Sequence, residues 1–167
     1  MKAPFRMEPL GEAHDRGAFS CGQAALDKYF QTQATQDIRR RVSNCFVAVE
    51  TVSGRVAAYY TMASASLPIT ELPIELTKKL PRYPSLPAVL IGRLAVDRAF
   101  QGRKLGAALL SDALQRVLSA APAAYALLVD AKDESAAAFY RHYGFTPITG
   151  RPMTLFLPVA TGLKTLS

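Results

Sequence analysis

Apolar residues between positions 26 and 42 recur at helical spacing, with polar residues between them. Leu26, Tyr29 and Phe30 form one apolar stripe. Ser20 followed by Gln23 has the spacing of a capping box, in which two side chains close the first turn of a helix. These signals predict a helix that runs to about Phe30.

A second helix is expected over residues 31–41. Its apolar positions, Ala34, Ile38 and Val42, repeat every four residues. This spacing places Arg39–Arg41 mainly on the opposite side, where they are available to a partner.

The next forty residues predict a hairpin and then an irregular segment. Cys45–Glu50 and Arg55–Met62 are rich in Val, Phe and Tyr and flank Ser53-Gly54, which is typical of a β-hairpin. Five prolines interrupt Leu67–Pro87 and leave room only for a short helix over Ile74–Leu80. We expect Leu67–Pro87 to form a rigid, irregular segment.

The second half begins with a strand and a strong helix. Ala88–Val96 is nearly all apolar and predicts a strand buried on both faces, with Gly92 marking a bulge or a close backbone approach. Lys104–Ala120 predicts a helix ended by Pro122, and Tyr125–Asp130 predicts another buried strand. On the helix, Leu105, Leu109, Leu110, Leu114, Val117 and Leu118 are expected to face inward, and Ser111, Asp112, Gln115, Arg116 and Ser119 to face water.

The last forty residues predict a capped helix and two strands. Asp133 can cap a helix over Glu134–Tyr143, and Gly144 can end it. Phe145–Ile148 and Met153–Pro158 then predict short strands.

The order of these elements predicts an α/β or α+β fold with a mixed sheet. Neither a repeat nor a linker divides the sequence, so residues 1–167 are expected to form a single domain. Half of the residues are hydrophobic and 20% are charged, which excludes a disordered chain.

Cysteine and histidine are too scarce for a disulfide framework or a metal site, so we expect no metal. Cys21 and Cys45 are the only cysteines, and His14 and His142 lie far apart. Cys45 is expected in the core, and neither thiol is expected to be a nucleophile. No apolar run reaches roughly 18 residues, and Met1–Asp15 has no apolar secretion segment, so a cytoplasmic protein is expected.

The net charge is +7, from 20 basic and 13 acidic residues. This balance favours a phosphate-bearing partner, either a nucleic acid or a nucleotide cofactor, and charge alone does not decide between them. Clusters at Arg39–Arg41 and Lys78–Arg82 are equally compatible with solvated helical faces.

Residues 94–106 carry the most informative pattern, because a buried strand passes through a glycine-containing turn directly into a helix. Such a junction directs backbone N–H groups and the positive end of the helix dipole at one spot, which suits a pyrophosphate. The spacing is neither that of a Walker A loop nor that of a dinucleotide fingerprint. A turn without a ligand remains the alternative.

Two motifs in this region resemble the GNAT superfamily of N-acetyltransferases. Gln101–Gly106 is similar to its acetyl-CoA loop, Arg/Gln-x-x-Gly-x-Gly/Ala, with Lys104 in place of the first glycine. Ala136–Phe145 is similar to its Ala-x-x-Phe-Tyr-x-x-x-Gly-Phe segment, and Asp133 stands where many members carry asparagine. The resemblance implies a mostly antiparallel sheet flanked by helices, and acetyl-CoA as co-substrate. Implied cofactor contacts are Leu94, Ala95, Val96, Gln101, Gly102, Arg103, Lys104, Leu105, Gly106, Asp133 and Ser135.

The resemblance is closer still to the TacT-type acetyltransferase toxins and extends along nearly the whole chain. It rests on Phe19-Ser-Cys-Gly22, Leu26-Asp-Lys-Tyr29, the basic helix, Ile91–Val96 and Met153–Pro158. Membership implies acetylation of the α-amino group of aminoacyl-tRNA, which stops translation. It also implies a homodimer and a ribbon-helix-helix antitoxin as partner.

Acetyl transfer to an α-amino group is compatible with these residues. An α-amino group has a pKa of about 7.7 to 8.0 and is partly neutral without a strong base, whereas a lysine amine near 10.4 would require one. By resemblance, Tyr140 is the general acid that protonates the leaving thiolate, and the backbone of Leu94 and Val96 serves the pantetheine and acetyl oxygen. Without the resemblance, Tyr140 would be assigned to packing.

Two other functions stay open. One is acetyl transfer to a protein or small-molecule amine, and the other is a catalytically silent module that binds acetyl-CoA or RNA. The residues expected to contact an RNA backbone are Arg39, Arg40, Arg41, Lys78, Lys79, Arg82 and Arg93.

Overall fold

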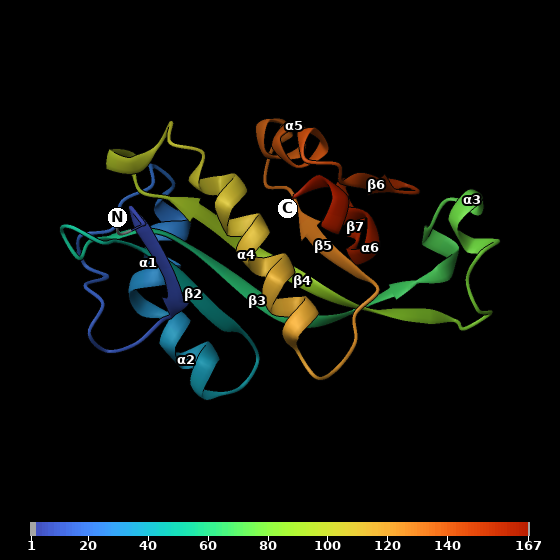
Figure 1. Ribbon diagram of the computed structural model, residues 1–167, viewed down its shortest axis with the longest axis horizontal. Coiled ribbons are helices and arrows are strands. Elements are labelled where there is room, and N and C mark those ends of the chain that lie inside the picture. Colours follow the sequence, from blue (N-terminus) through green and yellow to red (C-terminus); the bar gives the residue numbers. More distant parts are fainter. Residues whose placement is uncertain (1–2, 167) are drawn as a thin grey trace. The chain divides into compact units, whose positions relative to one another are not determined.

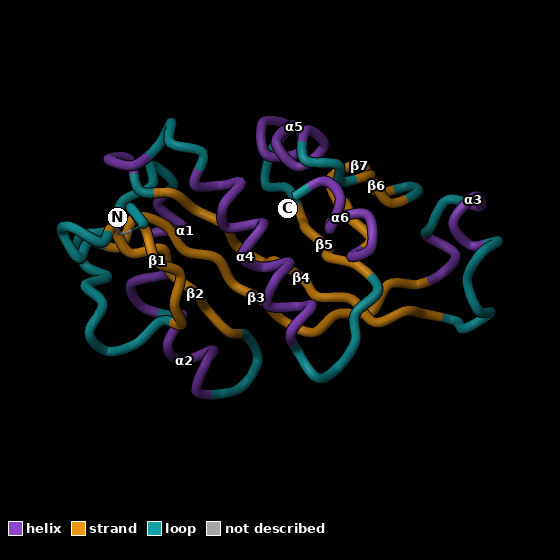
Figure 2. Tube along the Cα trace, viewed as in Figure 1, coloured by secondary structure: helices purple, strands orange, loops and turns teal. Residues whose placement is uncertain are grey.

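The computed structural model describes residues 3–166, which divide into two compact units. The first comprises the chain up to residue 63 together with residues 92–112, and the second comprises residues 64–91 and 113 onward. Seven strands hydrogen-bond in the order β1-β2-β3-β4-β5-β7-β6. The long strands β3 (Val56–Pro68) and β4 (Ser85–Val96) are drawn in Figures 1 and 2. Each of them contributes residues to both units.

The first unit contains an antiparallel meander and two short helices. Strand β1 (Phe5–Pro9) pairs with β2 (Asn44–Glu50), which pairs with β3 across the predicted hairpin. Helices α1 (Ala24–Thr32) and α2 (Ala34–Arg39) follow each other between β1 and β2. The hydrophobic core of this unit includes Phe19, Phe30 and Tyr59, whose rings contact one another.

The second unit is built around β5 (Ala126–Asp130), which pairs in parallel with β4 and antiparallel with β7 (Arg151–Pro158). Strand β6 (Thr146–Ile148) pairs with β7. Helices α3 (Ile74–Thr77), α5 (Glu134–His142) and α6 (Val159–Thr165) also belong to this unit. Helix α4 (Leu105–Ser119) begins in the first unit and ends in the second, and the 3₁₀ turns η1 (Ile69–Glu71) and η2 (Arg98–Phe100) complete the elements.

The predicted fold class is confirmed, since the chain forms a mixed, mostly antiparallel sheet flanked by helices. Strand β1 and helix α6 were not predicted, because neither segment carries a clear apolar periodicity. The predicted second helix shortens to α2, and Arg41 with a φ of 61° lies beyond its end.

The capping box was a wrong prediction. Helix α1 begins at Ala24, and its N-cap Gln23 makes no side-chain capping bond. The backbone N–H of Ser20 instead donates to the side chain of Asp97, 77 residues later. A tertiary contact has replaced the local one.

Two surface assignments on α4 were also wrong. Leu118, expected to face inward, is 41% exposed. Asp112, expected to face water, accepts a hydrogen bond from the Tyr60 hydroxyl at 2.6 Å. The other five apolar positions on this helix are buried as predicted.

Strand β4 is not buried on both faces. Leu86, Ala88, Ile91 and Ala95 are buried, whereas most of the side chains between them are half-buried or exposed. At Gly92 a Cβ would lie 3.2 Å from the side-chain oxygen Thr61 Oγ1, so the close neighbour at this glycine is a side chain and not another backbone segment.

The two ends of α5 are formed as predicted. Asp133 Oδ1 accepts a hydrogen bond from the N–H of Ala136 at 2.8 Å. At the other end Gly144 has a φ of +96°, and the N–H groups of Gly144 and Phe145 donate to the carbonyls of Arg141 and Tyr140. This bonding pattern is a Schellman motif.

Replacing Gly144 by alanine is expected to lower the free energy of unfolding by about 2 kcal/mol, because the left-handed backbone disfavours a Cβ. That Cβ would also lie 3.2 Å from Thr165 Cγ2. Gly150→Ala is the control, since Gly150 also has a positive φ but nothing within 4 Å of its Cβ position. Urea unfolding should show a loss of only about 1 kcal/mol for the control. Equal losses in the two variants would show that the contact with Thr165 has no effect.

Candidate functional site

The junction between β4 and α4 has the backbone that the sequence predicts for an anion site. After β4 and η2, Gln101–Lys104 form an exposed loop in the first unit. Two of its residues are left-handed, Gly102 with a φ of +84° and Lys104 with a φ of +59°. The carbonyl of Lys104 accepts from the N–H of Ala108, so the helix starts there and its first-turn N–H groups have no partner within the helix. These donors and the helix dipole can receive an anion.

Lys104 occupies the place of a glycine in the resembled motif, and its backbone explains why glycine is usual there. A left-handed residue with a Cβ costs roughly 1–2 kcal/mol, a cost that glycine avoids. Lys104 nevertheless adopts this conformation, so the loop has a left-handed residue at this position without a glycine. Its exposed ammonium adds a positive charge at the start of α4.

Burial along β4 does not follow a strict two-residue period, because Leu86 and Ala88 are buried at even positions and Ile91 and Ala95 at odd ones. Residues 88–91 nevertheless pair with β5 in regular register, so the bulge expected after Arg93 stays a prediction. The backbone N–H of Arg93 donates to Thr61 Oγ1 at 3.0 Å.

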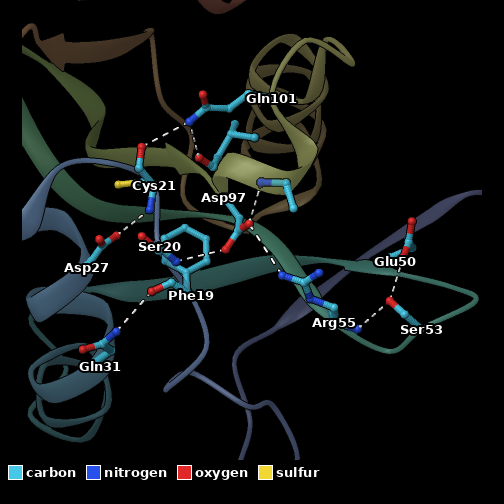
Figure 3. A network of polar contacts seen from close by, with 12 residues as sticks. Phe19, Ser20, Cys21, Asp27, Gln31, Glu50, Ser53, Arg55, Asp97 and Gln101 are labelled. Carbon is cyan, nitrogen blue, oxygen red and sulfur yellow. Dashed lines mark hydrogen bonds and ion pairs between the residues drawn. The ribbon is translucent and has the colours of Figure 1, made fainter.

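Three strand residues are predicted to contact the cofactor. Ala95 is buried, and Leu94 and Val96 are half-buried. The carbonyl of Val96 accepts from Gln101 Nε2 at 3.0 Å. The side chain of Gln101 is therefore directed at the protein's own backbone (Figure 3).

Tyr140 lies on α5 in the second unit and is 7% exposed. Its ring contacts those of Phe139 and Phe145, with centroid distances of 5.3 and 5.4 Å. Burial raises the pKa of Tyr140 to about 12, so the phenol keeps its proton at neutral pH. A group in this state can act as a proton donor.

The hydroxyl of Tyr140 has no hydrogen-bond partner among residues 3–166. In the same part of the chain, no fully enclosed side-chain oxygen or nitrogen lacks a partner. The Tyr140 oxygen is therefore not fully enclosed and can be reached by a ligand. Asp133 and Ser135, the other predicted site residues of this unit, lie at the exposed start of α5.

The predicted RNA contacts divide into two kinds. Six are exposed: three follow one another at the end of α2, and three lie in or after the last turn of α3. Arg93 is different, because it is half-buried and its guanidinium carbon lies 3.5 Å from the centroid of the Tyr29 ring. The six exposed residues are Arg39, Arg40, Arg41, Lys78, Lys79 and Arg82.

The Tyr29 ring that holds Arg93 is itself held by Asp37. The Tyr29 hydroxyl donates to Asp37 Oδ2 at 2.7 Å. Burial and this bond to a carboxylate raise the pKa of Tyr29 to about 12, and the same bond lowers the pKa of Asp37. Helices α1 and α2 therefore fix the position of Arg93, a relation that the sequence did not reveal.

Asp97 is a second feature that the sequence analysis missed. It is a carboxylate only 3% exposed, placed directly after β4. It accepts N–H bonds from Ser20 and Ala99 and lies 3.8 Å from the guanidinium of Arg55 (Figure 3). An acidic residue immediately after an apolar strand was the available signal.

The described residues 3–166 contain no group of three or more side chains that could hold a metal ion. Nor does this part of the chain contain a helix long and apolar enough to cross a membrane. Cys45 is buried, and burial raises the pKa of its thiol to about 12, which removes the thiolate that a nucleophile needs. Cys21 is half-buried, and its thiol donates to the carbonyl of Gln23.

A model of the acetyltransferase (GNAT) domain matches residues 87–154. The chain is 37% identical over 150 residues to a tRNA-acetylating toxin of Mycobacterium tuberculosis, covering 89% of this chain and 88% of that protein. It is also similar to AtaT complexed with acetyl-methionyl-tRNAfMet, with a TM-score of 0.88, 30% identity and coverage of 98% and 99% of the two chains.

A second similar structure is a tyrosine-to-phenylalanine variant of the AtaT toxin bound to the C-terminus of the antitoxin AtaR and acetyl-CoA. Its TM-score is 0.79 at 27% identity, with 95% of each chain covered.

Alkylation can check the state of Cys45. In a Cys21→Ser variant at pH 8, iodoacetamide is expected to label the folded protein negligibly, because the buried Cys45 thiol stays protonated. Mass spectrometry after denaturation should show one label. Rapid labelling of Cys45 in the folded variant would contradict its placement in the core.

Proposed function

Because this chain belongs to the GNAT acetyltransferase family, we propose that it transfers the acetyl group of acetyl-CoA to the α-amino group of an aminoacyl-tRNA. The observation that carries the proposal is the 37% identity over 89% of the chain to a tRNA-acetylating toxin. The product would be a charged tRNA whose blocked amine cannot enter a peptide bond, so translation stops.

The loop between β4 and α4 is the proposed binding site for the pyrophosphate of acetyl-CoA. Residues 102–106 contribute backbone N–H groups at the start of a fifteen-residue helix. The side chains of Arg103 and Lys104 are exposed and add positive charge. Backbone groups of Leu94 and Val96 would bind the pantetheine and the acetyl oxygen, and Asp133 and Ser135 would bind the pantetheine arm.

The acetyl thioester supplies an activated carbonyl. The acceptor's α-amino nitrogen attacks this carbonyl, a C–N bond forms and the C–S bond breaks. An α-amino group with a pKa of about 7.7 to 8.0 is partly neutral at cellular pH and can attack without a strong base, and the proton that the nitrogen loses as the amide forms passes to solvent. Tyr140 keeps its proton at neutral pH, would donate it to the departing thiolate, and would then regain a proton from solvent.

The exposed arginines and lysines near α2 and α3 are the proposed contacts to the RNA backbone. Phosphate contacts need accessible positive charge, which these residues provide, and such contacts do not read the sequence. Arg93 is proposed as a fixed contact, because its stacking on Tyr29 holds the guanidinium in place. The residues are Arg39, Arg40, Arg41, Lys78, Lys79, Arg82 and Arg93.

We further propose that the protein acts in the cytoplasm, as a homodimer, and that an antitoxin with a ribbon-helix-helix DNA-binding part restrains it. The similarity to an AtaT variant bound to the C-terminus of the antitoxin AtaR supports a partner of this kind. Residues 1–167 would form a single acetyltransferase domain.

Tyr140→Phe is expected to lower kcat by about 10²- to 10⁴-fold, the usual contribution of a general acid. Folding should be unaffected, because the Tyr140 hydroxyl has no partner to lose among residues 3–166. Transfer of labelled acetate from acetyl-CoA to total charged tRNA measures the effect. Tyr143→Phe is the control, because it removes a phenol hydroxyl three positions further along the chain, and it should keep wild-type activity. Full activity of Tyr140→Phe would end the assignment.

Removing a phosphate contact should reduce the salt dependence of tRNA binding. For Arg39→Gln, the slope of log Kd against log salt concentration is expected to fall by about one. Arg151→Gln removes the same charge from an arginine already paired with Glu71 at 2.6 Å and should leave the slope unchanged. Equal slopes for wild type and Arg39→Gln would exclude this residue from the RNA interface.

A further inference from the structure

The loop that the proposed function assigns to acetyl-CoA is poorly held by its own side chains. Gln101, Gly102, Arg103 and Lys104 are all exposed, so none of them contributes a buried apolar side chain. Arg103 lies 3.5 Å from Glu50, and its guanidinium carbon lies 5.4 Å from the centroid of the Phe100 ring, but exposed contacts of these kinds each add little stability. Some other part of the protein must fix the loop if its N–H groups are to be in place before the ligand arrives.

The side-chain amide of Gln101 supplies one such connection. Its Nε2 donates to the carbonyl of Val96 at 3.0 Å and to the carbonyl of Cys21 at 3.1 Å (Figure 3). Both partners are acceptors, so the NH₂ end of the amide is the end directed at them, and both of its hydrogens are used. Gln101 thus joins the first residue of the loop to the end of β4 and to a segment 80 residues earlier.

Asp97 and Arg98 connect the same two segments again. Ser20 donates its N–H to Asp97 Oδ2 at 2.9 Å, and its carbonyl accepts the N–H of Arg98 at 2.8 Å. Gly22, with a φ of +96°, lies against the guanidinium of Arg98, where a Cβ would be 3.3 Å from Nε.

Residues 19–22 are themselves firmly attached to the first unit. The Phe19 ring is buried, and its carbonyl accepts from Gln31 Nε2 at 3.1 Å. The N–H of Cys21 donates to Asp27 Oδ1 at 2.8 Å. Both partners lie on α1, so the segment is bonded to this helix as well as to the loop.

We propose that residues 19–22 form a brace that holds the acetyl-CoA loop in its binding conformation, and that Gln101 and Asp97 are positioning residues that act through this brace. The brace gives a function to the Phe19-Ser-Cys-Gly22 motif, which the proposed reaction does not otherwise use. Gln101 contributes through Cys21 and Val96 and does not touch the ligand. The inference rests on the proposed function, because it requires that the loop binds acetyl-CoA.

The test compares a donor that reaches the loop with one that does not. Acetyl-CoA carries the pyrophosphate, whereas acetyl-pantetheine lacks it. Replacing a residue that positions the loop should weaken the reaction with acetyl-CoA and leave the reaction with acetyl-pantetheine unchanged. A variant that merely destabilises the protein should impair both reactions.

Gln101→Met keeps the length of the side chain and removes the two N–H groups that donate hydrogen bonds to Val96 and Cys21. Its Kd for acetyl-CoA, measured by titration calorimetry, and its KM should rise about tenfold, as the loss of two hydrogen bonds implies. We expect kcat with charged tRNA, and kcat/KM with acetyl-pantetheine, to stay within about twofold of wild type. Gln115→Met is the matched control, because Gln115 is an exposed glutamine on α4 whose side chain makes no hydrogen bond with residues 3–166.

Gly22→Ala and Asp97→Asn separate the brace from direct ligand contact. Gly22 lies outside the loop, so both variants should reproduce the rise in Kd for acetyl-CoA while sparing acetyl-pantetheine. Weaker binding in Gln101→Met alone would mean that Gln101 contacts the ligand itself and would overturn the brace. Unchanged binding in all three variants would overturn it as well. Failure of the wild-type protein to bind acetyl-CoA would instead refute the proposed function.

Discussion

The burial of one carboxylate organises the junction on which the candidate site depends. Asp97 is 3% exposed, and an unpaired charge in such a place costs on the order of several kcal/mol. The chain avoids this cost by directing the N–H groups of Ser20 and Ala99 and the guanidinium of Arg55 toward it. Hydrogen bonding of the Asp97 carboxylate therefore brings Ser20 to the end of β4 and to η2, at the start of the loop.

Elements closed by local chemistry could be predicted from the sequence. Asp133 and Gly144 bound α5 because an N-cap and a left-handed C′ residue act within a few positions of the chain. The hairpin between β2 and β3 is local in the same sense. The same kind of reasoning failed at Ser20, whose backbone bonds to a residue 77 positions away.

The candidate site was predictable by residue type more than by orientation. The motif located the loop of residues 101–106, and the structure places two left-handed residues in it. It did not reveal that the Gln101 side chain bonds to backbone carbonyls, or that Tyr29 stacks on Arg93. Both relations join segments distant in sequence, and no periodicity or spacing rule encodes such contacts.

The Schellman end of α5 has a consequence for how this protein can evolve. The N–H of Phe145 bonds to the carbonyl of Tyr140, and the Phe145 ring packs on the phenol, so the turn that Gly144 permits also orients Tyr140. A substitution tolerated by the helix alone would still disturb the phenol. A change at this glycine would therefore alter both the end of α5 and the position of the phenol that the proposed reaction uses.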